Sequence, residues 1–116
     1  MLIRIVTAVV AAVALAGCSG GPGDGYTVAH RAQGNGSGSA DLVMPGAGQA
    51  QARQALRDYA GTISGVELYY LKVVRSEGAG RYVCRARWYR DAAAFRAHTV
   101  GESMPGRWPH LAIHCP

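Results

Sequence analysis

Apolar and polar residues repeat with different periods along the second half of the chain, and each period predicts an element. Between residues 46 and 60, apolar side chains recur every three or four positions, which predicts a helix with one apolar stripe. The stripe comprises Ala52, Ala55, Leu56, Tyr59 and, just beyond it, Ile63. Pro45 suits the first turn of this helix, and Gly61 suits the position after its end. We therefore expect one main amphipathic helix here.

Two segments rich in Val, Leu and Tyr follow this helix. Residues 66–75 and 81–90 are separated by a Gly-containing turn at 77–80, which predicts a β-hairpin. In the second segment one face carries Tyr82, Cys84, Ala86 and Trp88, and the other carries Val83, Arg85, Arg87 and Tyr89. Because the arginine face should meet water, we expect the cysteine face to point into the core.

Shorter elements complete the predicted order. Residues 26–31 alternate weakly and predict a short peripheral strand. Asp91 suits the N-cap of a short helix at 92–98, and residues 110–115 alternate as a final strand. We expect an α+β fold in β-α-β-β-α-β order. Its small antiparallel sheet of three to four strands would have the helix at 46–60 packed on one face.

The N-terminal segment indicates where the protein resides. Arg4 precedes an uncharged run at residues 5–17 made mostly of Ala and Val. This run is shorter than the roughly 20 apolar residues of a membrane span, but it has the length of the apolar part of a signal peptide. It leads into Leu-Ala-Gly-Cys at residues 15–18, which resembles the lipobox of bacterial lipoproteins. The resemblance implies removal of residues 1–17 and a diacylglyceryl group on Cys18. It also implies a place on the extracytoplasmic face of the cell membrane.

The segment after Cys18 is rich in Gly and Ser. We expect residues 18–40 to form a flexible tether, interrupted at most by the short strand at 26–31. Residues 33–40 in particular have the composition of a linker. The globular α+β domain is then expected to span residues 41–116.

Two cysteines remain once Cys18 is lipidated. Cys84 and Cys115 lie on the apolar faces of their predicted strands, and an exported compartment is oxidising, so we expect them to form a disulfide. A ferredoxin-like sheet would separate their strands by about 10 Å, whereas a disulfide needs Cα atoms within about 7 Å. We therefore expect the strand at 110–115 to lie beside the strand at 81–90.

The charge balance excludes one class of partner. The 116 residues include 12 Lys and Arg against 7 Asp and Glu, a formal net charge of +5. The basic residues form no dense run, and an exported location also argues against nucleic acid. A mild positive charge is compatible with an anionic membrane surface.

Motifs for catalysis or metal binding are weak. His110 and His114 share a face of the last predicted strand but would lie roughly 13 Å apart, too far for one zinc ion. Ser103 stands in a near match to the nucleophile elbow, but Pro105 replaces its last glycine and no strong strand precedes it. We expect no metal site, no catalytic residue and no cofactor.

The remaining signal is a pattern of arginine and aromatic residues. Arg85, Arg87 and Tyr89 share the outward face of their strand, and Trp108 lies in a nearby Pro-rich loop. Since Tyr, Trp and Arg dominate binding hot spots, these four are the candidate partner-binding surface, and a merely solvated face is the alternative. The leading hypothesis is a non-enzymatic, membrane-anchored module that binds an envelope protein or polymer. Two alternatives stay open: a small extracytoplasmic hydrolase using Ser103 or a histidine, and a structural or stress-related lipoprotein without a specific ligand.

Overall fold

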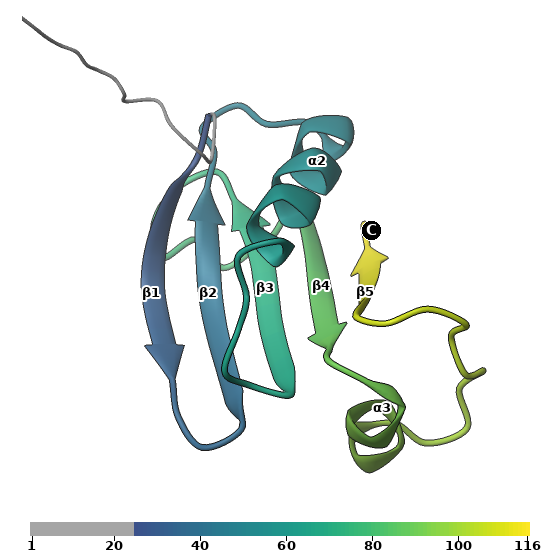
Figure 1. Cartoon of the computed structure of the whole chain (residues 1–116). Helices are drawn as coiled ribbons and strands as arrows, with labels where there is room; N and C mark the ends of the chain where they lie inside the picture. Colours follow the sequence, from purple (N-terminus) through teal and green to yellow (C-terminus); the bar gives the residue numbers. More distant parts are fainter. Residues whose placement is uncertain (1–24) are drawn as a thin grey trace, which may run out of the picture.

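A computed structural model describes residues 25–116, which form one five-stranded sheet with two helices (Figure 1). The elements are β1 (Thr27–Gln33), β2 (Ser37–Val43), α2 (Gln49–Ala60), β3 (Leu68–Val74), β4 (Cys84–Tyr89), α3 (Ala92–His98) and β5 (His110–His114). The predicted signal peptide and Cys18 lie outside the described residues. The predicted α+β character is confirmed, but the sheet has five strands instead of three to four.

The sheet order follows the chain order, β1-β2-β3-β4-β5, and one pair is parallel. β2 and β3 run parallel because α2 carries the chain back along the sheet between them, whereas the other three pairs are antiparallel. The expectation of a wholly antiparallel sheet was therefore wrong. No helix within residues 25–116 is long and apolar enough to cross a membrane.

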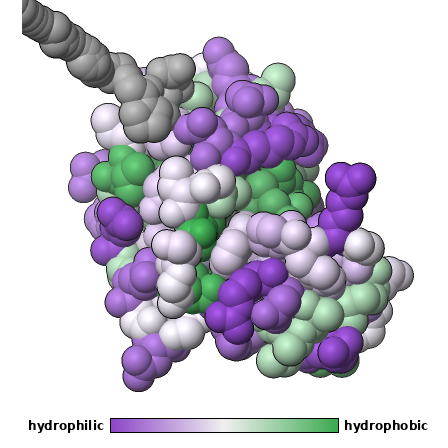
Figure 2. Space-filling view, viewed as in Figure 1, coloured by the Kyte–Doolittle hydropathy of each residue, from purple (hydrophilic) through white to green (hydrophobic). Residues whose placement is uncertain are grey.

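Helix α2 covers one face of the sheet with the predicted apolar stripe. Its buried residues are Ala52, Ala55, Leu56 and Tyr59. The helix begins three residues later than expected because Gly46 has a positive φ of 76°, which is incompatible with a right-handed helix. The Gly48 backbone N–H donates to Gln51 Oε1 at 2.9 Å and caps the first turn. Polar residues gather on the outward side of α2, near the top of the view in Figure 2.

The core beneath α2 includes one polar contact. The hydroxyl groups of Tyr59 and Tyr69 lie 3.0 Å apart, and both side chains are buried. Burial, reinforced by this hydrogen bond, raises the pKa of Tyr59 to about 12. The Tyr59 hydroxyl therefore stays protonated at neutral pH, and the two hydroxyl groups satisfy each other inside an apolar core.

The structure joins Cys84 and Cys115 by a disulfide, with their Cα atoms 4.2 Å apart. β5 pairs antiparallel with β4, as the cysteine argument required. The predicted pairing and the predicted neighbour of the last strand agree with the structure. Since β5 is a short edge strand, the disulfide fastens one margin of the sheet to its interior.

The predicted flexible segment at 33–40 is instead part of the sheet. Residues from Ser37 onward form β2, which lies between β1 and β3, so the domain begins well before residue 41. The reason is local crowding at Gly38. A Cβ atom there would lie 2.6 Å from Cε2 of Tyr69, so only glycine lets the tyrosine ring pack against the strand. The glycine content that suggested a linker reflects close packing.

Strand β1 occupies the other margin, as predicted for a peripheral strand. Its pairing with β2 shifts register between Ala29 and Ala32, and His30 has a positive φ of 51°. An irregularity of this kind bends an edge strand and makes it a poorer template for a further strand.

Helix α3 closes one end of the opposite face. Asp91 Oδ1 accepts a hydrogen bond from the Ala94 backbone N–H at 2.9 Å, so the predicted N-cap is confirmed. This bond and the neighbouring Arg90 lower the pKa of Asp91. Phe95 packs on Leu68 and Tyr89 in a second small core. Within residues 25–116, no helix covers the rest of this face of the sheet.

Candidate functional site

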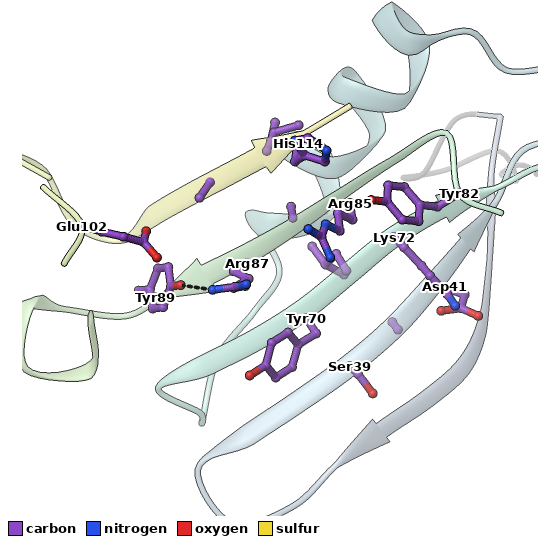
Figure 3. A pocket seen from close by; sticks show the side chains of 15 residues that line it. Ser39, Asp41, Tyr70, Lys72, Tyr82, Arg85, Arg87, Tyr89, Glu102 and His114 are labelled. Carbon is purple, nitrogen blue, oxygen red and sulfur yellow. Dashed lines mark hydrogen bonds between the residues drawn. The ribbon is translucent and has the colours of Figure 1, made fainter. Parts of the chain in front are cut away.

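A hollow of about 660 Å³ lies on the face of the sheet opposite α2 (Figure 3). Its floor is the outward side of β2 to β5. We call it the sheet-face groove and define it by Tyr70, Lys72, Tyr82, Arg85, Arg87 and His114. Its volume falls within the roughly 300–1,000 Å³ typical of sites for small molecules.

Strand register brings the basic residues of the groove together. Lys72 of β3 stands opposite Arg85 of β4, which in turn stands opposite His114 of β5. Arg87 lies two residues along β4 on the same face. Neighbouring strands are about 4.8 Å apart and a two-residue step is roughly 6.8 Å, so three permanent cations share one hollow. Like charges directly opposite one another destabilise a sheet, so the arrangement is unfavourable for folding alone.

None of these three cations forms an ion pair within the described part of the chain. The ion pairs there join other residues, and no carboxylate oxygen of residues 25–116 lies within 4.0 Å of the Lys72, Arg85 or Arg87 nitrogens. Arg85 instead lies over the ring of Tyr82, 5.5 Å from its centroid. Arg87 Nη1 donates a long hydrogen bond of 3.5 Å to the Tyr89 hydroxyl, which raises the pKa of Arg87.

Two carboxylates also line the groove without pairing with these cations. Asp41 of β2 stands opposite Lys72 in register. Glu102 enters from the loop that follows α3, and Figure 3 shows its carboxylate directed toward Tyr89 and the Arg87 side of the groove. The groove therefore keeps a cationic centre flanked by an acidic group on either side.

Two tyrosines frame the cationic centre. Tyr70 is 49% exposed and stands opposite Arg87 in register. Tyr82 was predicted to point inward with Cys84, and this was wrong. The strand begins at Cys84, and both Val83 and Cys84 are buried, so the alternation does not extend back to Tyr82. Its ring lines the groove instead.

The predicted partner surface is only partly assembled. Arg85 and Arg87 are exposed on the open face, as expected. Tyr89 lies on that face but is only 1% exposed, because Phe95 of α3 packs edge-on against it with ring centroids 5.0 Å apart. The expectation that Tyr89 offers an open contact surface was wrong, although its hydroxyl reaches the groove. Trp108 packs on Phe95 and does not line the groove.

Sequence reasoning missed Tyr70, Lys72 and His114 as members of the site. The period-two pattern of β3 placed Tyr70 and Lys72 on the face opposite Tyr69 and Leu71, which was a usable signal. What the sequence did not give was the register that sets Lys72 beside Arg85.

The other candidate residues lie elsewhere. His110 stacks on Tyr89 with ring centroids 6.5 Å apart, whereas His114 is exposed in the groove. In the described ranges, no three His, Cys, Asp or Glu side chains gather as a metal ion would require. Ser103 lies exposed in the loop between α3 and β5. The predicted absence of a metal site and of a catalytic residue stays a prediction.

Comparison with protein-family models, with curated proteins and with solved structures gives no match for this chain.

Proposed function

We propose that this chain is a lipid-anchored, non-enzymatic module of the bacterial envelope that binds a partner through the sheet-face groove. One observation carries the proposal: Lys72, Arg85 and Arg87 lie together on an open face and form no ion pair with a carboxylate of residues 25–116. Clustered cations that disfavour the fold are expected where they serve binding. The anchoring half of the proposal is supported by the lipobox-like sequence that ends at Cys18.

Replacing Cys18 with alanine tests the anchor. We expect Cys18→Ala to lose incorporation of radiolabelled palmitate and to leave the membrane fraction or stay unprocessed, because two acyl chains are needed for stable anchoring. The neighbouring substitution Ser19→Ala is the matched control and should keep the label. Equal labelling of Cys18→Ala and the wild type would contradict lipidation at this residue.

Reversing two groove charges tests the binding face. The double variant Arg85→Glu/Arg87→Glu should lose at least about tenfold of the envelope material crosslinked to the wild type, as expected for hot-spot cations. Its free energy of unfolding should change by less than about 1 kcal/mol, because both positions are exposed and Glu at position 85 would face Lys72 favourably.

The matched control is Arg57→Glu/Arg96→Glu, which makes the same change in net charge on exposed helical positions outside the groove. It should keep the crosslinked material. If both double variants lose it equally, net charge is responsible and the groove is not the binding face. If neither loses it while both stay folded, the partner binds elsewhere.

A further inference from the structure

The groove has features that select one kind of anionic group. We propose that it binds the terminal phosphate group of a soluble phosphomonoester ligand, and that Glu102 competes with this phosphate for the cationic centre. The inference rests on the proposed function, because it names the ligand class of the same groove.

The number of convergent donors favours phosphate over carboxylate. A carboxylate carries one negative charge and has two oxygens, both of which a single guanidinium can engage in a planar fork. Here two guanidinium groups from β4 and one ammonium group from β3 share the hollow. A phosphate offers three or more acceptor oxygens in a tetrahedral arrangement and up to two negative charges, so it can engage forks and a point charge together.

The resident carboxylates support the same choice. Asp41 and Glu102 already line the hollow, yet neither lies within 4.0 Å of a nitrogen of Lys72, Arg85 or Arg87. A ligand carboxylate would meet the same cations with the same chemistry and would have to compete with these two. A doubly charged phosphate is attracted to three cations more strongly than a singly charged carboxylate is.

The shape of the site argues for a soluble ligand instead of a bilayer surface. The cations lie on the floor of a concave hollow, between the rings of Tyr70 and Tyr82 and the Glu102 loop. A terminal phosphate on a slender soluble molecule can enter such a hollow. Headgroups packed in a flat bilayer cannot follow the same concave surface without leaving their neighbours.

Glu102 is placed where it can regulate the binding of phosphate in the sheet-face groove. It arrives on the loop between α3 and β5, where the side chains of Val100 and Met104 are 95% and 46% exposed. Its carboxylate faces the Arg87 side of the groove. Replacing it with glutamine removes a competing charge and keeps the side-chain size.

The test is a titration of the full-length chain in an uncharged detergent with inorganic pyrophosphate, at constant ionic strength set with sodium chloride. The signals followed are the Nε–Hε resonances of the arginine side chains. We expect saturable shifts of two resonances, assigned to Arg85 and Arg87 by their loss in the single variants Arg85→Lys and Arg87→Lys. The double variant Arg85→Glu/Arg87→Glu should lose pyrophosphate binding, whereas Arg57→Glu/Arg96→Glu should keep it. Glu102→Gln should tighten binding by roughly 2- to 5-fold, the range of one partly exposed charge pair.

Three results would overturn the proposal. They are shifts that do not saturate, shifts of equal size with malonate, and a response of the arginine signals to phosphatidylglycerol vesicles but not to pyrophosphate. Unchanged affinity in Glu102→Gln would refute the competing role of that residue.

The outcomes distinguish failure of the phosphate proposal from failure of the proposed binding function. Loss of crosslinked material in the double variant without pyrophosphate binding leaves the groove as a partner site with a different ligand. Pyrophosphate binding with crosslinked material unchanged shows a phosphate site that does not serve the partner.

Discussion

Replacing both Cys84 and Cys115 with alanine is expected to lower the free energy of unfolding by about 3–4 kcal/mol, the largest effect of any change considered for this domain. The two residues are 31 positions apart in sequence. Closing a loop of that length removes much of the conformational freedom of the unfolded chain. For a domain of this size such a loss is a large fraction of the total stability.

Urea denaturation of the purified full-length chain, followed by tryptophan fluorescence, measures this effect. Treating the wild type with dithiothreitol should produce a loss of similar size, whereas the same treatment should leave the double alanine variant unchanged. A loss below about 1 kcal/mol in both cases would show that the edge strand is held by its other contacts. Because His114 of β5 lines the groove, we also expect weaker pyrophosphate binding in the reduced protein before it unfolds globally.

The disulfide also shows which parts of the fold were accessible from sequence. Strand periodicity placed both cysteines on inward faces, and the limited reach of a disulfide then fixed β5 beside β4. Helix α3 and its Asp91 cap followed from purely local signals. These predictions succeeded because each depends on residues close together in the chain or on one strict distance.

The candidate site was less accessible because it depends on tertiary register. Sequence alternation identified Arg85 and Arg87 as outward residues, and this was confirmed. It could not show that Lys72 stands opposite Arg85, nor that Phe95 of α3 covers Tyr89. Both facts depend on how separate elements align, and a shift of register by one residue would reverse every face.

The prediction of a flexible tether at residues 33–40 was the largest error, and it has a single physical cause. Gly and Ser between residues 33 and 40 have the composition of a linker, so local reasoning predicted a tether. In the structure, the part of β2 at residues 37–41 alternates polar outward residues with small inward ones, and its inward Gly38 lies against the buried ring of Tyr69. The glycine content of a segment shows that side chains are absent. It does not show whether a neighbouring ring packs into the space above the glycine.

Gly38→Ala is therefore expected to destabilise the domain by about 1–3 kcal/mol, the usual cost of forcing a methyl group into a packed interior. The new Cβ would lie 2.6 and 2.8 Å from two carbons of the Tyr69 ring and 3.2 Å from the Ala32 carbonyl oxygen. Tyr69 is only 2% exposed and its hydroxyl is hydrogen-bonded to Tyr59, so the ring cannot move aside freely. The added methyl group therefore forces either strand β2 or the ring out of its packed position, at a cost in stability.

Gly80→Ala is the matched control, because a Cβ at Gly80 meets nothing within 4 Å and its φ lies outside the left-handed region. It should leave stability unchanged or raise it by up to about 1 kcal/mol by restricting the unfolded chain. Thermal unfolding of the two variants, monitored by circular dichroism, compares the same chemical change in crowded and open surroundings. If Gly38 belonged to a flexible tether, the two variants would behave alike. If β2 is a packed strand, the midpoint of thermal unfolding should fall in Gly38→Ala but not in Gly80→Ala. Both variants add the same methyl group, so a difference between them reflects what that group touches.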